Sequence, residues 1–137
     1  MAPWLALAAG LLSVLVALGF AWWVVKRPAG TDQMQRIASY IQEGAMAFLR
    51  REYLTILWFV LGVVALILVG IGAQEGFGFA VLTAIAYVVG AGFSLAAGWF
   101  GMSINTRANV RTAAAAREGF AQALTTAFFG GSVMGLT

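Results

Sequence analysis

Four long apolar runs constrain what this chain can fold into. They cover residues 4–25, 54–73, 77–104 and 120–137. A helix of about 20 predominantly apolar residues crosses the hydrocarbon core of a bilayer, and each run is near or above that length. The chain is 62% hydrophobic and only 9% charged, whereas soluble domains carry about 25% charged residues. We therefore predict an all-α, polytopic membrane protein with about four transmembrane helices in a single membrane region, residues 1–137.

The first run, residues 4–25, is predicted to be an uncleaved membrane helix rather than a signal peptide. A signal peptide carries its positive charge before the apolar stretch, whereas here Lys26 and Arg27 follow it. Trp22 and Trp23 suit the aromatic belt at a membrane interface. The N-terminus is therefore expected on the outer side of the membrane.

Residues 32–51 are predicted to form a cytoplasmic amphipathic helix. Thr31 or Asp32 can cap it, because either side-chain oxygen can accept a hydrogen bond from an amide of the first turn. We expect this helix to lie on the membrane surface or to pack on neighbouring cytoplasmic parts. A binding role for Glu43 or Arg50 is the less favoured alternative. Its apolar residues recur at steps of three and four positions: Met34, Ile37, Ile41, Ala45 and Phe48.

The third and fourth apolar runs each carry a small residue at every fourth position. Such a spacing makes a flat helix face that another membrane helix can approach closely. We interpret both stripes as packing faces rather than cofactor sites. The two stripes are Ala86, Gly90, Ser94 and Gly98, and Ala123, Ala127, Gly131 and Gly135.

The positive charge predicts how the chain is oriented. All eight basic residues lie within residues 26–53 and 105–118, whereas the N-terminus and the short turn at residues 74–76 hold none. By the positive-inside rule both basic segments are cytoplasmic. Residues 105–118, with Arg107, Arg111 and Arg117, form a basic elbow between the third and fourth spans. We expect this protein in the cell (inner) membrane.

Several kinds of chemistry are excluded by composition. The chain has no cysteine and no histidine, and Asp32 is its only aspartate. Disulfides, thiolate or imidazole metal sites and nucleophile–histidine pairs are thereby absent. The pI of about 10.0 reflects the basic segments, which membrane topology explains without nucleic acid. We expect no catalytic, cofactor-binding or metal-binding residue in this chain.

Two stretches resemble the N-terminal part of the membrane-integral pyrophosphatases. This family comprises ion pumps that hydrolyse inorganic pyrophosphate to drive protons or sodium across a membrane. The first stretch is Ile41-Gln-Glu-Gly-Ala-Met-Ala-Phe-Leu-Arg-Arg-Glu-Tyr53. The second is Thr106-Arg-Ala-Asn-Val-Arg-Thr112 with the alanine run 113–116, leading through Arg117 into Phe129-Gly-Gly-Ser-Val-Met-Gly-Leu-Thr137.

The resemblance implies a larger bundle in two concentric rings of helices, working as a homodimer, with pyrophosphate held by Mg²⁺ and many aspartates. This chain would supply outer-ring helices, and the family's aspartate-rich substrate motif has no counterpart in it. Arg107 and Arg111 are candidates for steering pyrophosphate, but topology and helix-end capping explain them better. Glu118 suits the positive end of the following helix.

We therefore predict that this chain is an N-terminal part of a pyrophosphate-energised ion pump. The family as a whole is enzymatic, but we expect this chain alone to be inactive. Its expected partners are the lipid bilayer and the remaining helices of the pump. Thr137 is expected to be a truncation point. The alternative is a self-contained small multi-pass assembly or interaction protein without enzymatic activity, which an immediate stop codon after Thr137 would favour. A transporter half is the least supported option, because the spans hold no charged side chain. The resemblance implies that proton or sodium specificity and potassium dependence are determined by residues outside this chain.

Overall fold

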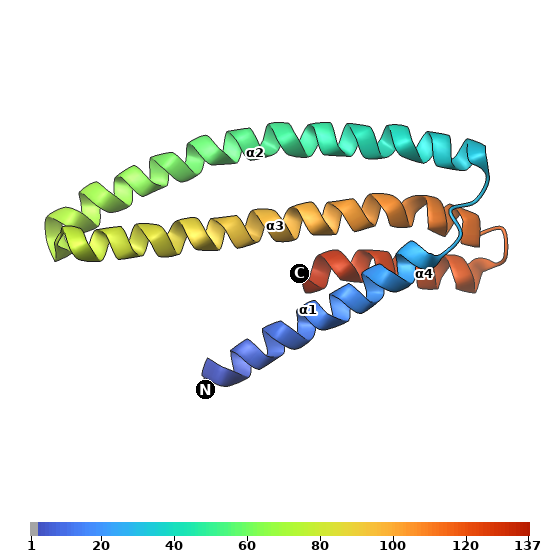
Figure 1. Ribbon diagram of the computed structural model, residues 1–137, viewed down its shortest axis with the longest axis horizontal. Coiled ribbons are helices and arrows are strands. Elements are labelled where there is room, and N and C mark those ends of the chain that lie inside the picture. The colour runs from blue at the N-terminus through green and yellow to red at the C-terminus, as the bar shows by residue number, and fades with distance from the viewer. Residues whose placement is uncertain (1–2) are drawn as a thin grey trace. The chain divides into compact units, whose positions relative to one another are not determined.

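The computed structural model describes residues 3–137 and contains four α-helices (Figure 1). They are α1 (Pro3–Lys26), α2 (Asp32–Glu75), α3 (Phe77–Ala115) and α4 (Phe120–Leu136). No strand occurs among the described residues. The chain divides into two compact units, one comprising residues up to 46 together with 97–137 and the other residues 47–96. The predicted all-α class is confirmed.

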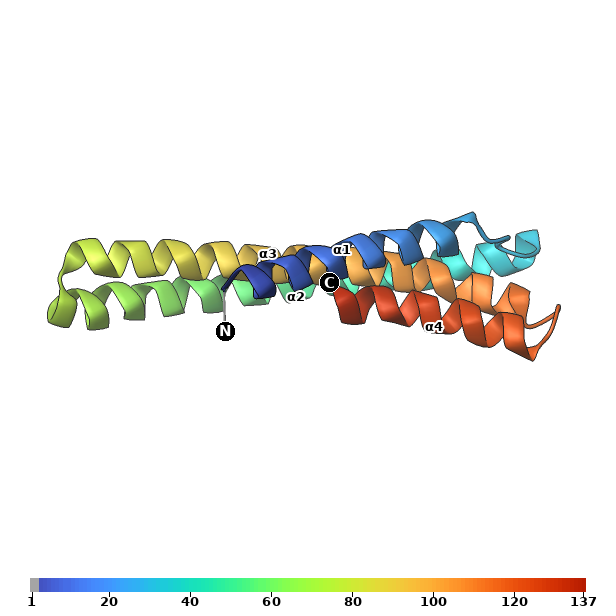
Figure 2. The same ribbon diagram turned by 90° about the horizontal axis from the view of Figure 1, so that it is seen from below.

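In the first unit α1 and α4 pack against each other, as Figures 1 and 2 both show. The Ser13 hydroxyl on α1 donates a hydrogen bond of 2.7 Å to the carbonyl of Leu136 near the end of α4. Phe20 stacks on Phe129 with ring centroids 4.5 Å apart. A small core, contributed by α1, α3 and α4, consists of Ala21, Ile104 and Val133, with Phe20 and Phe100 packed against it.

The second unit is a hairpin made by the later part of α2 and the earlier part of α3. Gly76 alone separates the two helices, and its positive φ of 90° is a conformation that glycine adopts without steric cost. Val60 and Ala80 are buried in this unit, and the Tyr53 hydroxyl donates to the carbonyl of Leu95. The reversal predicted at residues 74–76 is confirmed.

Large apolar side chains cover much of the surface of the described chain. Trp58, Leu66 and Phe93 are 74%, 73% and 75% exposed. Helices α1, α2 and α3 are long and apolar enough to cross a membrane, whereas α4 is a shorter apolar helix of 17 residues. Because a soluble protein rarely exposes such extensive apolar surface, these helices belong to a membrane protein. The exact limits of the spans, and a fourth span at residues 120–137, stay predictions.

Helices α2 and α3 are longer than the sequence segments suggested. The amphipathic segment 32–51 and the second apolar run join into one helix of 44 residues. Residues 50–53 contain no glycine or proline, so the change from polar to apolar alters the surroundings of the helix without breaking its backbone. In the same way α3 continues through most of the predicted elbow, because its alanine run favours helix. The turn between α3 and α4 occupies only residues 116–119.

Within the described chain, α4 packs through a face other than its small-residue stripe, and packing of that stripe on further helices stays a prediction. The buried residues of α4 are Thr126, Gly130 and Val133, whereas Gly131 and Gly135 are exposed. A periodic small residue permits close approach but does not decide which stripe meets a neighbour. In α4 the contacts of Phe129 with α1 bury the neighbouring face, which carries Thr126, Gly130 and Val133. The stripe on α3 is likewise exposed at Ala86, Gly90 and Ser94, and Gly98 is half-buried.

Candidate functional site

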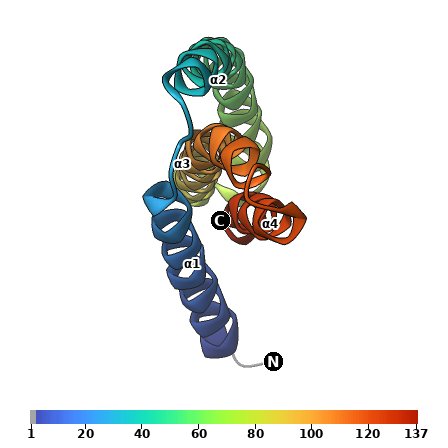
Figure 3. The same cartoon turned by 90° about the vertical axis from the view of Figure 1, so that its right-hand side faces the viewer.

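The two basic segments meet in the first unit, where α1 ends, α2 begins and α3 approaches its end (Figure 3). The link from α1 to α2 is short, and Gly30 has a positive φ of 78°. A Cβ at residue 30 would lie 2.7 Å from the sulfur of Met34, whose flexible side chain could move aside, so it is the positive φ that favours glycine there. The Thr31 hydroxyl accepts from the amide of Met34 at 3.4 Å. Thr31 is therefore the N-cap of α2, which confirms one of the two predicted alternatives, Thr31 or Asp32.

Arg111 ties α3 to the end of α1. Its Nε donates to the carbonyl of Arg27 at 3.1 Å, and its Nη2 donates to the carbonyl of Val25 at 3.1 Å. These carbonyls lie at a helix C-terminus, where they have no partner within the helix and the dipole is negative. A third bond, from Nη1 to the carbonyl of Arg107 at 2.9 Å, fixes the guanidinium on its own helix. Burial, and then the positive charge of Arg107, lower the pKa of Arg111 below its ordinary value.

Aromatic rings hold the same end of α1 from another side. The ammonium of Lys26 lies 3.7 Å from the centre of the Trp22 ring, and the guanidinium of Arg27 lies 4.1 Å from that of Trp23. Trp23 in turn packs edge-on against Phe129 of α4 at 4.8 Å. Cation–π contacts of this kind contribute about 0.5–1 kcal/mol at exposed sites. The terminal charges of α1 are thus positioned by its own tryptophans.

A groove of about 290 Å³ lies beside Arg111, and we call it the arginine groove. Polar side chains from α2 and two arginines from α3 line it. None of its lining residues is acidic. They are Val25, Ala29, Gln35, Ala38, Ser39, Gln42, Thr106, Arg107, Val110 and Arg111.

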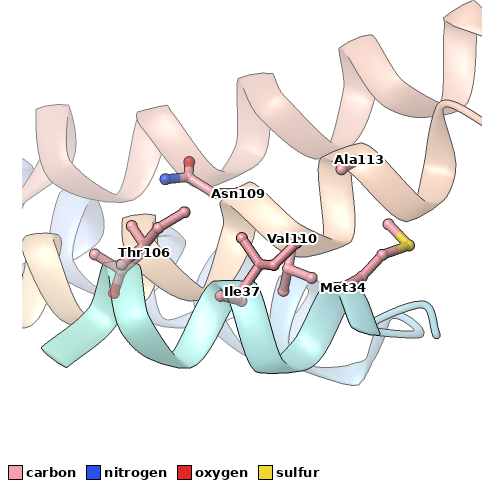
Figure 4. A pocket seen from close by; sticks show the side chains of 8 residues that line it. Met34, Ile37, Thr106, Asn109, Val110 and Ala113 are labelled. Atoms are coloured by element: carbon pink, nitrogen blue, oxygen red, sulfur yellow. The ribbon is translucent and has the colours of Figure 1, made fainter. Parts of the chain in front are cut away.

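A second groove of about 240 Å³ adjoins the first and is almost wholly apolar; we call it the apolar groove. The two grooves share Ala38, Thr106 and Val110. Figure 4 shows Ile37 of α2 and Val110 of α3 pointing toward each other across it. The remaining lining residues are Met34, Ile41, Asn109 and Ala113.

Comparison with known proteins decides the family. A family model described as inorganic H⁺ pyrophosphatase matches residues 11–137. The chain belongs to the inorganic H⁺ pyrophosphatase family. The match includes both stretches on which the sequence resemblance rests, residues 41–53 and 106–137, and so confirms the predicted family.

Individual relatives in this pyrophosphatase family are named as pumps for either ion. The chain is 44% identical over 129 residues to a K⁺-insensitive pyrophosphate-energized proton pump of Moorella thermoacetica, covering 94% of this chain and 18% of the relative. It is 44% identical over 128 residues to a proton pump of the same description from Methanosarcina mazei, covering 93% and 18%. A K⁺-stimulated pyrophosphate-energized sodium pump of Thermotoga maritima is 42% identical over 129 residues, covering 90% and 17%. The chain therefore spans less than a fifth of the length of these pyrophosphatase relatives.

Pyrophosphatase chemistry would use magnesium bound through carboxylate oxygens. Among residues 3–137 no three of the His, Cys, Asp and Glu side chains come together. The described residues therefore do not fit a magnesium cluster that holds pyrophosphate. The absence of catalytic and metal-binding residues from this chain stays a prediction.

The structure places the other candidate residues of this chain outside the arginine groove. Arg117 and Glu118 line a groove of about 310 Å³ with Thr31 and Ala114, apart from the arginine groove. Glu118 lies before the N-cap residue of α4, Gly119, and that helix has no side-chain cap; the expected role of Glu118 is therefore limited to its charge. Glu43 and Arg50 are exposed on α2. Sequence reasoning missed the bonds of Arg111 to α1, because residues 84 and 86 positions apart carry no local signal.

Proposed function

We propose that this chain supplies scaffold helices of an ion pump that couples pyrophosphate hydrolysis to proton or sodium translocation. The observation that carries the proposal is the match across more than nine-tenths of the chain to named pumps of which it spans about 18%. The pump's activity, its Mg²⁺ and its homodimeric assembly are parts of this proposal. In it, this chain contributes no catalytic residue, and Mg²⁺ and pyrophosphate are bound by other parts of the pump.

The structure supports a scaffolding task through the way the ends of its helices are fixed. Arg111 joins α3 to α1 by two hydrogen bonds, and Phe20 and Trp23 join α1 to α4 through Phe129. Extensive apolar side-chain surface remains exposed on every helix. Such surface suits contact with lipid and with further helices of a larger bundle.

The proposed orientation follows the distribution of charge. Residues 26–53 and 105–118 carry all eight basic residues and are placed on the cytoplasmic side of the cell (inner) membrane. The N-terminus and the turn at Gly76 are placed outside. In this orientation the arginine groove faces the cytoplasmic interface.

Chimaeric pumps test the proposal directly. The matching segment of the Thermotoga sodium pump and that of the Moorella proton pump are each replaced by this chain's residues, and pyrophosphate hydrolysis and ion uptake are measured in membrane vesicles. We expect both chimaeras to hydrolyse pyrophosphate and each to move the ion of its host, because scaffold helices do not select the ion. A reciprocal exchange between the two hosts controls for the junctions. Chimaeras that assemble but cannot hydrolyse, beside active reciprocal exchanges, would contradict the proposal.

The isolated chain provides a second measurement. Purified and supplied with Mg²⁺ and pyrophosphate, it is expected to release phosphate no faster than a buffer blank. Clear turnover by the 137-residue chain would show that it carries catalytic residues and would overturn the scaffold assignment.

A further inference from the structure

We propose that the arginine groove binds the phosphate of an anionic glycerophospholipid and that the adjoining apolar groove receives the start of one acyl chain. This site is separate from pyrophosphate chemistry, and it rests on the membrane location and the cytoplasmic placement of the basic segments given in the proposed function. Four observations carry it: the uncompensated charge, the polar lining from α2, the apolar extension and the position beside tryptophans.

The charge in the groove has no counter-ion within the described chain. Arg107 and Arg111 both line the groove, four residues apart on α3, and the groove contains no carboxylate. The guanidinium of Arg107 has no hydrogen-bond or ion-pair partner among residues 3–137. Arg111 uses three N–H groups on carbonyls, and a guanidinium has five. Planar guanidinium groups bind phosphate oxygens in pairs of parallel hydrogen bonds, so the groove favours a phosphate-bearing anion.

Helix α2 adds uncharged polar groups opposite the arginines. Gln35, Ser39 and Gln42 are spaced by four and three residues, so they lie on one helix face and line the groove together. Gln35 already donates to the carbonyl of Gly30 at 3.1 Å, and Ser39 to that of Arg36 at 2.8 Å. The half-buried Gln42 has no hydrogen-bond partner among the described residues. Its amide is available to a bound headgroup.

The apolar groove favours an amphipathic ligand over a free phosphate ion. It shares lining residues with the arginine groove, and Ile37 and Ile41, which line it, are 53% and 50% exposed. Ile37 can be seen in Figure 4. A phosphate or pyrophosphate ion would leave these side chains in water. A phospholipid would cover them with an acyl chain, and burial of apolar surface adds to the binding free energy.

The position of the groove agrees with a headgroup. Val25 near the end of α1 and Ala29 in the link that follows line it. Both are close in sequence to Trp22 and Trp23, and tryptophan is a residue type that gathers at the membrane–water interface. Basic pockets between membrane helices on the cytoplasmic side commonly hold anionic lipid headgroups. We therefore assign a lipid rather than a soluble ion.

The test uses the full 137-residue chain, purified in detergent and examined by native mass spectrometry with equal amounts of phosphatidylglycerol and phosphatidylcholine. We expect bound phosphatidylglycerol to exceed phosphatidylcholine several-fold. R107Q is expected to weaken phosphatidylglycerol binding about fivefold, the effect of one basic residue near a lipid surface. R36Q removes the same charge from an exposed position outside the groove and is expected to leave binding unchanged. Equal losses in both variants would refute a specific site.

Two further arms separate headgroup, chain and free ion. I41S is expected to weaken binding of long-chain phosphatidylglycerol more than that of its short-chain dihexanoyl analogue. Q42L changes the α2 side of the groove without removing charge and is also expected to weaken phosphatidylglycerol binding. It is therefore informative even if R107Q fails to fold. Millimolar pyrophosphate or inorganic phosphate should not displace the lipid. Displacement by either ion, or no effect of both Q42L and R107Q, would overturn the proposal.

Discussion

At the scale of single residues, Arg111 is predicted to stabilise the junction of α1 and α3. Arg111→Ala leaves the carbonyls of Val25 and Arg27 without their protein donor. Hydrogen bonds from charged groups contribute about 1.5–3 kcal/mol each, but water can replace the donor at this partly exposed end. Because water compensates in part, we expect a total loss of about 1–2 kcal/mol, less than two such bonds would contribute at a buried site, seen as a lower Tm in detergent by circular dichroism.

Arg36→Ala is the matched control for this change. Arg36 is exposed and its side chain has no hydrogen-bond or ion-pair partner among the described residues. It removes one positive charge, as Arg111→Ala does, without touching the end of α1. If both variants melted at the same temperature, the bonds of Arg111 to α1 would contribute nothing measurable.

At the scale of helices, the contact of α3 with α4 depends on a glycine. A Cβ at residue 130 would lie 2.5 Å from the Cβ of Ala108, whereas real Cβ atoms essentially never approach within 3.0 Å. Gly130→Ala is therefore expected to force the helices apart and to cost about 1–3 kcal/mol as overpacking. The neighbouring Gly131 has nothing within 4 Å, so Gly131→Ala should be neutral or stabilising by up to about 1 kcal/mol through helix propensity.

Thermal unfolding of the two alanine variants distinguishes the two possible faces of α4. A lower Tm for Gly130→Ala alone supports the face that the structure shows. A lower Tm for Gly131→Ala alone would instead support the stripe predicted from the spacing of small residues. The two variants differ only in the position of one Gly→Ala exchange, so their compositions are identical.

The same helices show what local sequence could and could not predict. The lengths of the apolar runs and the turn at Gly76 were sufficient to predict that these segments are helical and where the chain reverses between α2 and α3, because both are local signals. The face through which α4 packs in this chain was not predictable, since the adjacent Gly130 and Gly131 lie on different faces and the choice depends on Phe129 meeting α1. The continuity of α2 was obscured by its change of polarity at residues 50–53, which affects the surroundings of a helix more than its hydrogen bonds. The partners of Arg111 are distant in sequence and required the fold.

At the scale of the whole molecule, the family was predictable because its two motifs are contiguous stretches of sequence, confirmed by the match over residues 11–137. The arginine groove was not, because α1, α2 and α3 all contribute to it. Its charge was visible in the sequence as a topological signal. Only the fold shows that Arg107 and Arg111 share a groove with polar side chains of α2.

The orientation of the molecule yields the last prediction. The chain has no cysteine, so single cysteines can be introduced without a mutated background. Gln74→Cys lies beside the turn at Gly76, and Ala116→Cys lies in the turn after α3; both positions are exposed. Because positively charged segments remain cytoplasmic, a membrane-impermeant maleimide should label the Gln74→Cys variant in intact cells and the Ala116→Cys variant only after permeabilisation.

A third variant makes the topology measurement decisive. Ser39→Cys lies in the other basic segment, in an exposed position of α2, and should behave as Ala116→Cys does. The two basic segments together hold every lysine and arginine of the chain, so they must respond alike if charge sets the orientation. Labelling of Ser39→Cys and Ala116→Cys from opposite sides would require an odd number of membrane crossings between them and would exclude the hairpin of α2 and α3 as a pair of spans. Labelling of both from outside, with Gln74→Cys protected, would invert the molecule and place the arginine groove on the outer face.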